Sequence, residues 1–256
     1  MRVEGNTILI TGGTSGIGRA LAESFHKEGN QVIVAGRRKD LLDEVVAANR
    51  GMKAAVLDVA SAESIAAFAD RAKREYATLN VLINNAGIMH RESLRKGATA
   101  DAEAIIATNL LGAIRLTAAL LPLLLRQQNA AIMTVSSGLA FVPLAATPTY
   151  CATKAAVHSY TQSLRYQLRD SSIQVLELIP PYVQTELTGP GQASDKNAMP
   201  LSDFISESMG ILKNSPEAVE ICVERVKMLR NAEKNGNYVD FFKTFNDRAA
   251  ATHETL

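Results

Sequence analysis

The stretch Thr7-Ile8-Leu9-Ile10-Thr11-Gly12-Gly13-Thr14-Ser15-Gly16-Ile17-Gly18 decides the fold. A short apolar run, typical of a β-strand, leads directly into a turn with the spacing Gly-x-x-x-Gly-x-Gly. Apolar residues then recur at helical spacing until Gly29, a typical helix stop. A strand, a glycine-rich turn and a helix in this order bring backbone N–H groups onto a phosphate at the helix N-terminus. The stretch therefore predicts a nucleotide-binding unit.

The rest of the chain alternates strand-like and helix-like segments. Strands are predicted at residues 7–10, 31–35, 54–57, 81–83, 131–135 and 173–179, and helices between them at 41–49, 61–76, 102–127 and 149–168. This alternation predicts an α/β fold with a doubly wound parallel sheet, the Rossmann fold, in a single domain of residues 1–256.

The alternation weakens after Thr185. Residues 186–256 are predicted to form a substrate lid and a C-terminal helical extension, with two helical segments flanking Pro216 and a charged, poorly periodic tail. Within them, residues 186–210 are interpreted as the lid, and residues 189–200 as a mobile loop rich in Gly, Pro, Ser and Asn. An ordinary surface excursion remains the alternative.

Composition favours a soluble cytoplasmic globule. The chain has 256 residues, 47% of them hydrophobic, and a net charge of +1, with no basic run that would bind nucleic acid. Two cysteines fit a reducing compartment, and the histidines and cysteines lack metal-ligand spacing, so no metal is predicted. The apolar run 110–125 is interpreted as a buried helix, too short to span a membrane and interrupted by Arg115 and Pro122.

The end of the second predicted strand selects the cofactor. A carboxylate there would bind the ribose 2′-hydroxyl of NAD and repel a 2′-phosphate. This chain has Gly36 followed by Arg37 and Arg38, whose planar guanidinium groups match a phosphate. The alternative, a solvated helix start, is disfavoured because cations are unfavourable at a helix N-terminus. The sequence predicts NADP(H).

Tyr150 and Lys154 are candidates for proton chemistry. Residues four apart on a helix share one face, so the phenol and the ammonium point the same way. A nearby cation favours the phenolate, which predicts a lowered pKa for Tyr150 and proton exchange with a carbonyl or alcohol oxygen. A Tyr-x-x-x-Lys pair also occurs by chance, so the pair depends on the rest of the chain for support.

Further polar residues follow the predicted strands. Asp58 would bind the adenine amine or cap the next helix, and Asn109 would be either a structural bridge or part of a proton relay. His90 would lie on the surface rather than in the pocket, and Cys151 would be a small buried thiol rather than a nucleophile.

Taken together, these motifs resemble those of the short-chain dehydrogenase/reductases. Residues 11–18, Asn84-Asn85-Ala86-Gly87, Asn109, Ser137, Tyr150-x-x-x-Lys154 and Pro180…Thr185 stand in that family's order and spacing over residues 5–187. The run Ser-Ser-Gly-Leu-Ala-Phe-Val-Pro-Leu before Tyr150 is similar to the DltE-like branch of the family.

The resemblance implies a role for each matching residue. Tyr150 would exchange the proton, Lys154 would lower its pKa and hold the nicotinamide ribose, Ser137 would bind the substrate oxygen, and Asn109 would hold a relay water. The cofactor would be bound by Gly12, Thr14, Ser15, Gly16, Ile17, Gly18, Arg37, Arg38, Asp58, Val59, Asn85, Ala86, Gly87, Tyr150, Lys154, Pro180, Val183 and Thr185. The substrate would meet Ser137, Leu139, Val142, Tyr182 and Leu187, a mostly apolar set.

Two departures from the family pattern are visible. Pro180-Pro181 replaces the usual Pro-Gly, which stiffens the backbone. The C-terminal region offers Asn237-Tyr238-Val239-Asp240 instead of the family's glycine-rich strand, which leaves a seventh strand open. The apolar helices around Asn109 and after Tyr150 resemble subunit contacts of the family, so a homodimer or homotetramer is expected.

The leading functional hypothesis is an NADPH-dependent carbonyl reductase, reversible as a secondary-alcohol dehydrogenase, acting on a small carbonyl or alcohol substrate. The alternative is a non-catalytic NADP-binding sensor or scaffold on the same fold. An epimerase or dehydratase with the same tyrosine is disfavoured because the chain offers no substantial C-terminal substrate domain.

Overall fold

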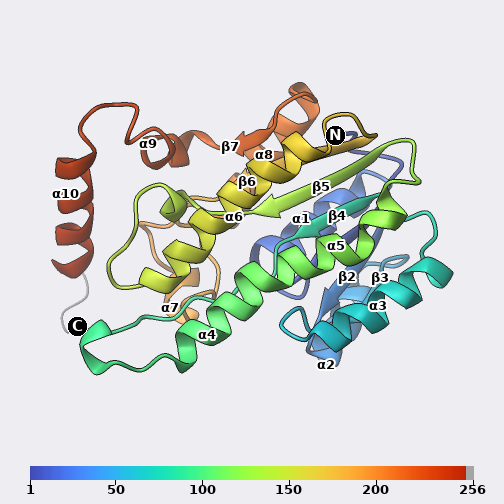
Figure 1. Cartoon of the computed structure of the whole chain (residues 1–256), viewed down its shortest axis with the longest axis horizontal. Coiled ribbons are helices and arrows are strands. Elements are labelled where there is room, and N and C mark those ends of the chain that lie inside the picture. The colour runs from blue at the N-terminus through green and yellow to red at the C-terminus, as the bar shows by residue number, and fades with distance from the viewer. Residues whose placement is uncertain (252–256) are drawn as a thin grey trace.

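Seven parallel strands form the central sheet of the molecule, flanked by helices on both faces (Figure 1). In a computed structural model that describes residues 1–251, the strand order is β3-β2-β1-β4-β5-β6-β7. The strands are β1 Thr7–Thr11, β2 Gln31–Gly36, β3 Lys53–Val56, β4 Val81–Asn84, β5 Ala130–Val135, β6 Ile173–Ile179 and β7 Glu220–Cys222. The predicted doubly wound parallel sheet is confirmed.

Helices occupy the connections between the strands. They are α1 Gly16–Lys27, α2 Lys39–Ala48, α3 Ala62–Glu75, α4 Ala100–Ile106, α5 Gly112–Leu124, α6 Pro148–Gln167, α7 Pro190–Ala193, α8 Leu201–Asn214, α9 Lys227–Arg230 and α10 Tyr238–Ala251. Because the chain runs outward from β1 to β3 and then returns to β4, the strand order reverses between β1 and β4. Ligands of such sheets bind at this switch point, outside the strand carboxyl ends.

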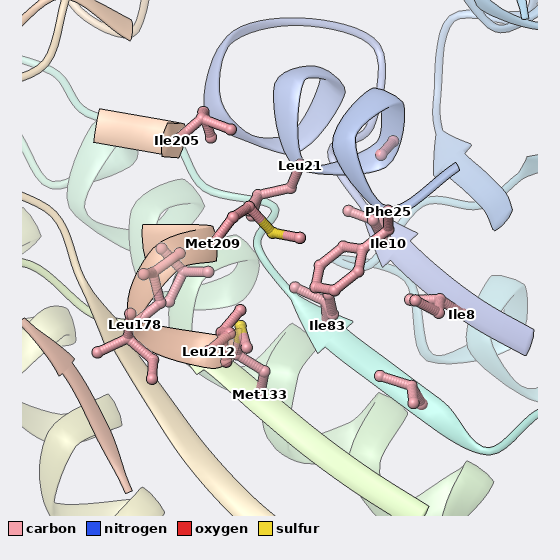
Figure 2. Close-up of a cluster of buried hydrophobic side chains, with 14 of the residues drawn as sticks. Ile8, Ile10, Leu21, Phe25, Ile83, Met133, Leu178, Ile205, Met209 and Leu212 are labelled. Atoms are coloured by element: carbon pink, nitrogen blue, oxygen red, sulfur yellow. The ribbon is translucent and has the colours of Figure 1, made fainter. Parts of the chain in front are cut away.

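Two apolar layers hold the sheet, one on each face. Strand residues alternate between them, so that Ile8 and Ile10 belong to one cluster and Leu9 to the other. Figure 2 shows the first cluster, in which side chains of α1 and α8 meet those of the strands: Leu21, Phe25, Ile205, Met209, Leu212, Ile8, Ile10, Ile83, Met133 and Leu178. The second lies under α3, α5 and α6. Burial on both sheet faces explains the continuous apolar strand sequences.

The C-terminal third differs from the sequence-based expectation. A seventh strand does form, but from residues 220–222, after Pro216, where a helical segment was predicted. The region around Asn237, considered above for that strand, begins α10 instead, and the tail predicted to be poorly periodic is helical to Ala251. The seventh strand is only three residues long and has one neighbour, β6, so its pattern is too short to recognise.

The long apolar helix predicted at 102–127 is interrupted. A π-helical turn, Ala107–Leu111, separates α4 from α5 and contains Asn109. A π turn shifts the hydrogen bonds by one residue and is frequent at functional sites. Here it places the buried Asn109 side chain against Ile88, in the segment that follows β4.

One helical stretch among the described residues, Ala100–Leu124, is long and apolar enough to cross a membrane by length and composition, with a mean hydropathy of 1.8. The sequence predicted that the apolar run 110–125 is too short to span a membrane. That prediction is wrong for the helical stretch that contains most of it, which is 25 residues long. A core helix of a soluble protein passes the same test, so one such helix is weak evidence for a membrane span. Here 33% of the window is buried.

Candidate active site

The glycine turn between β1 and α1 forms the phosphate end of the candidate site. Gly12 and Gly16 have positive φ angles of 66° and 52°, a backbone conformation that glycine adopts without strain. The Ser15 side chain makes no cap bond, and the first turn of α1 has no acidic residue. Free N–H groups and no competing carboxylate fit an anionic pyrophosphate.

Close packing fixes the same turn. A Cβ atom on Gly18 would lie 2.3 Å from both the Gly12 carbonyl oxygen and Asn85 Nδ2. The Asn85 amide donates to the carbonyl oxygens of Thr11 and Gly12, at 2.9 and 3.3 Å, so it holds the turn rather than pointing away from it. Thr11 Oγ1 in turn accepts from the N–H groups of Asn85 and Ala86.

Arg37 and Arg38 lie exposed after β2, where the predicted 2′-phosphate would be. The Arg38 guanidinium donates to Thr14 Oγ1 at 3.5 Å, which brings it beside the glycine turn. Asp58 accepts from the Ala60 N–H at 2.9 Å, and it is Ser61 that caps α3. The alternative that Asp58 caps that helix is therefore wrong. Val59 is buried against Gly112.

The predicted catalytic residues meet at the carboxyl ends of β4 and β5. Lys154 Nζ lies 5.6 Å from the centre of the Tyr150 ring and donates to the Val135 carbonyl oxygen at 2.7 Å. Ser137 is the second residue after β5, and its hydroxyl interacts with the Tyr150 phenol. A Cβ atom on Gly87 would lie 3.7 Å from Lys154 Nζ. A small residue at this position thus lets the backbone after β4 lie close to the ammonium.

Burial controls the protonation of both key groups. It raises the pKa of the Tyr150 phenol, against a smaller lowering by the Ser137 hydroxyl. It lowers the pKa of Lys154 to about 8, against a raising interaction with Glu177. The predicted lowering of the Tyr150 pKa by Lys154 is wrong for this structure, because desolvation of a phenol that is 6% exposed dominates. Tyr150 is a protonated acid at neutral pH.

Asn109 acts as a structural bridge. Its Oδ1 accepts from the Ile88 N–H at 2.9 Å, and its Nδ2 donates to the Ile88 carbonyl oxygen at 2.9 Å and to Thr153 Oγ1 at 3.3 Å. The side chain therefore fixes the segment after β4 against α6. A cavity of about 10 Å³ beside Asn109 and Lys154 matches the space of one water molecule.

The segment after β6 closes over the glycine turn. Thr185 Cγ2 lies 3.4 Å from the position of a Cβ on Gly16, which places Thr185 at the phosphate end. Gln192 Nε2 donates to the Val183 carbonyl oxygen at 2.7 Å and to Thr185 Oγ1 at 3.0 Å. The buried Pro180 carbonyl accepts from the Gly138 N–H. The predicted loop 189–200 thus contains the short helix α7, and Gln192 in this helix binds the segment that directly follows β6 by hydrogen bonds.

The predicted substrate residues fall into two groups. Leu139 is half-buried and packs with Tyr150, while Tyr182 and Leu187 are exposed at the rim. Val142 is completely buried, so the prediction that it lines an open pocket is wrong. Tyr182 donates to Asp195 Oδ2 at 3.1 Å, and burial, followed by this carboxylate, raises its pKa to about 12.

Two further expectations concern His90 and Cys151. His90 is exposed, and its Nδ1 lies 3.0 Å from Asp101, as expected of a surface residue. Cys151 is a buried free cysteine whose Sγ makes hydrogen bonds with the Leu144 carbonyl oxygen and the Thr147 hydroxyl. Burial raises the pKa of its thiol, as expected of a structural cysteine.

Sequence reasoning missed two sets of residues near this site. Asn246 of α10 binds the loop before Tyr150, donating to the Pro143 carbonyl oxygen at 3.1 Å and accepting from the Ala145 N–H at 2.6 Å. His158, Glu177 and Glu220 converge behind Lys154 from α6, β6 and β7. One of these residues could have been found from the sequence, because His158 follows Lys154 at helical spacing and so lies on the same face of the helix. The contacts of Asn246, Glu177 and Glu220 join residues far apart in sequence, and no local pattern indicates them.

Comparisons with known proteins identify the family of the chain. The chain matches the family described as short chain dehydrogenase over residues 6–196. The uncharacterized oxidoreductase DltE of Bacillus subtilis (strain 168) is 39% identical over 254 residues, covering 96% of this chain and 98% of the relative. This similarity confirms the resemblance to the DltE-like branch.

Solved structures show the same fold with bound cofactors. A short-chain dehydrogenase from Sphingobium yanoikuyae in complex with NADPH has a TM-score of 0.78 and 28% identity, covering 90% of this chain and 94% of that one. A short chain dehydrogenase/reductase from Burkholderia phymatum in complex with NAD has a TM-score of 0.79, covers 92% and 95% and, at 21% identity, supports the fold alone. The family match, together with the glycine turn and the Tyr150–Lys154 pair, shows that the chain belongs to the short-chain dehydrogenase family of oxidoreductases.

Proposed function

We propose that this protein is an NADPH-dependent carbonyl reductase, reversible as a secondary-alcohol dehydrogenase. The observation that carries the proposal is the convergence of Ser137, Tyr150 and Lys154 beside the Asn109 bridge, at the open end of the glycine turn. The raised pKa of Tyr150 favours the acid form that carbonyl reduction needs.

Each residue would have a defined task. When bound, a reduced nicotinamide would supply the hydride for the carbonyl carbon. Tyr150 gives its phenolic proton to the carbonyl oxygen while Ser137 donates a hydrogen bond to the same atom. Lys154 stabilises the phenolate that remains and holds the ribose hydroxyls. The cavity beside Asn109 would admit the water through which the tyrosine regains its proton from solvent.

The proposed preference for NADPH rests on Gly36, Arg37 and Arg38. No carboxylate stands at the end of β2 to repel a 2′-phosphate, and Arg38 already lies beside Thr14 in the turn. The NADPH complex of the Sphingobium relative supports the same choice.

For the substrate, we propose an apolar ketone or aldehyde. Leu139, Leu144 and Met89 pack around Tyr150, and Tyr182 and Leu187 form an exposed apolar rim. The segment 186–200, with α7, is the proposed lid. The rest of the predicted lid, residues 201–210, belongs to α8, whose Phe204, Ile205 and Met209 are packed in the apolar core, so that part of the prediction is wrong. Protein localisation is proposed to be cytoplasmic, as expected from the composition.

We also propose a homodimer through the exposed faces of α5 and α6. An apolar stripe is partly or fully exposed on α5 and at its end, formed by Ile114, Ala118, Leu121 and the C-cap residue Leu125. On α6, small residues are exposed at Ala152, Ala155 and Ser159. Apolar surface of this extent on two neighbouring helices is typical of a subunit contact.

The test is NADPH oxidation, compared with NADH, over aryl ketones, alkyl ketones and keto esters at pH 6 to 8. Tyr150→Phe should lose more than a hundredfold in kcat while still binding NADPH, since general acid catalysis contributes about 10² to 10⁴. Tyr166→Phe, an exposed tyrosine on the same helix, is the matched control and should turn over normally. Near-normal turnover by Tyr150→Phe would sink the proposal.

The cofactor choice has its own variant. Arg37→Ala combined with Arg38→Ala should raise the KM for NADPH at least tenfold and leave that for NADH unchanged. Equal use of both cofactors by the wild type would show that the arginines are surface residues. NADPH binding without turnover of any substrate would favour a non-catalytic sensor instead.

A further inference from the structure

A buried carboxylate lies behind Lys154. Glu177, in the middle of β6, has a fully buried side chain, and its two oxygens lie 2.8 and 3.0 Å from His158 Nδ1. His158 stands one helical turn after Lys154 on α6 and so faces the same way. A buried carboxylate costs several kcal/mol unless it is paired, so this residue needs an explanation.

The hydrogen bonds of His158 fix the orientation of the pair. Gln162 Nε2 lies 3.1 Å from His158 Nε2. An amide NH₂ group only donates, so His158 Nε2 accepts and Nδ1 carries the proton that binds Glu177. Glu177 thus accepts the Nδ1–H of His158, and this bond fixes the orientation of its carboxylate.

Two cations interact with this carboxylate: Arg230, which is already bonded to Glu220, and Lys154, whose Nζ binds the carbonyl oxygen of Val135, next to the residue that pairs with Glu177 in the sheet. Glu220 stands in register with Glu177 on the adjacent strand, but Arg230 donates to both of its oxygens at 2.8 and 2.9 Å. Arg230 also covers Phe141, whose ring meets His158 edge-on at 4.7 Å. The charged and titratable groups around the pair are Lys154, His158 and Arg165 on α6, Glu220 and Cys222 on β7, and Lys227 and Arg230 on α9.

A metal site is the other use that three such ligands suggest. The ligand atoms of His158, Glu177 and Glu220 lie within 4.8 Å of one another. The fork of Arg230 occupies both oxygens of Glu220, however, and a cation between the carboxylates would meet that guanidinium. The geometry therefore favours a charge pair over a metal centre.

We propose that Glu177, oriented by His158, is a positioning residue that keeps the Lys154 side chain charged inside the protein and so sets the pH range of the Tyr150–Lys154 pair. Its carboxylate opposes the desolvation of the ammonium, since the interaction of Glu177 with Lys154 raises the lysine pKa while burial lowers it to about 8. The catalytic part of this inference rests on the proposed function.

The test has one readout that needs no turnover. Lysine labelled with ¹³C at the ε carbon is titrated by NMR, and the Lys154 signal is assigned by its loss in Lys154→Arg. In the wild type it should titrate far below the other lysines. Glu177→Gln should lower its pKa by about one further unit, so that the neutral fraction at pH 7 rises about fivefold, whereas Glu177→Asp, which keeps the charge, should stay near the wild type.

A second variant guards against misfolding of the first. Glu177→Met fills a similar volume without charge or hydrogen bonding, and such replacements of buried charges are often neutral or stabilising. It should give the same shift of the lysine as Glu177→Gln. An unchanged Lys154 titration in a folded Glu177→Gln or Glu177→Met variant would overturn the proposal.

The activity arm uses the pH profile of NADPH-dependent reduction. In Glu177→Gln the loss of kcat/KM on the alkaline side should begin about one pH unit lower than in the wild type, with rates at pH 6 changed little. A shifted lysine titration with no turnover by any form would instead disprove the proposed function and leave the charge pair standing.

Discussion

At the scale of single residues, burial of the charged Lys154 side chain lowers the free energy of unfolding. Its pKa falls from 10.5 to about 8 in the folded protein, which corresponds to ~3 kcal/mol against the charged form. Because the folded pKa lies below the unfolded one, the cost is fully present below about pH 8 and disappears as the pH rises toward 10.5. The residue proposed to be essential for turnover thus weakens the fold at neutral pH.

Lys154→Met should therefore raise stability at pH 7 while it abolishes turnover. The gain is reduced by loss of the bond to the Val135 carbonyl oxygen, ~1 kcal/mol, which leaves a net ~2 kcal/mol. Thermal unfolding at pH 7 and pH 10 measures it, and the advantage should shrink at the higher pH. Lys234→Met, at an exposed position, is the control. A less stable Lys154→Met at pH 7 would show that the Val135 bond outweighs the burial cost.

Individual residues of the site differ in how far the sequence predicts them. Tyr150 and Lys154 are four positions apart on one helix, so local geometry predicts their shared face. Their protonation was not predictable, because it depends on burial by distant parts of the chain. Glu177 and Asn246 reach the site through contacts with His158 and the Pro143–Ala145 loop, and no local pattern marks such pairings.

At the scale of secondary-structure elements, the contact between the glycine turn and α1 leaves no room for a side chain. Gly18→Ala would place a methyl 2.3 Å from the Gly12 carbonyl oxygen, so the turn must move. We expect a loss of ~1–3 kcal/mol in the free energy of unfolding and weaker NADPH binding. Chemical denaturation and cofactor fluorescence measure the two effects.

Gly210→Ala is the matched control for that substitution. Gly210 lies in the middle of α8, and a Cβ there meets no atom within 4 Å. Removing a helical glycine should leave stability unchanged or raise it by up to ~1 kcal/mol. If Gly18→Ala proved as stable as Gly210→Ala, the packing argument for the turn would fail.

Element types were predicted better than element details. The first six strands in sequence, β1 to β6, could be predicted because each is an apolar run that packs against both layers of the core. The π turn at Asn109 was not visible, because one extra residue per turn barely changes the apolar spacing of a helix. β7 was missed because three residues joined to one neighbour carry almost no pattern.

At the scale of the whole molecule, the α4–α5 helix carries more apolar surface than one subunit buries. If α5 and α6 pair two copies, Ala118→Glu should convert the dimer to monomer, since a charge at the centre of the contact would lose its water. Light scattering after gel filtration measures the mass. Ala67→Glu, at an exposed position on α3, should leave the mass unchanged. A wild-type monomer would remove the dimer from consideration.

The contact between Asn246 and the Pro143–Ala145 loop also has a consequence for biosynthesis. The two parts of this contact are separated by 101 residues, and α10 leaves the ribosome after every strand of the sheet. Domains begin to fold from the N-terminal side during synthesis. The nascent chain can thus build its sheet and glycine turn well before the loop next to Tyr150 is held in place. A translation product that stopped before α10 would therefore have the shape of the full chain but would lack the contact that fixes this loop.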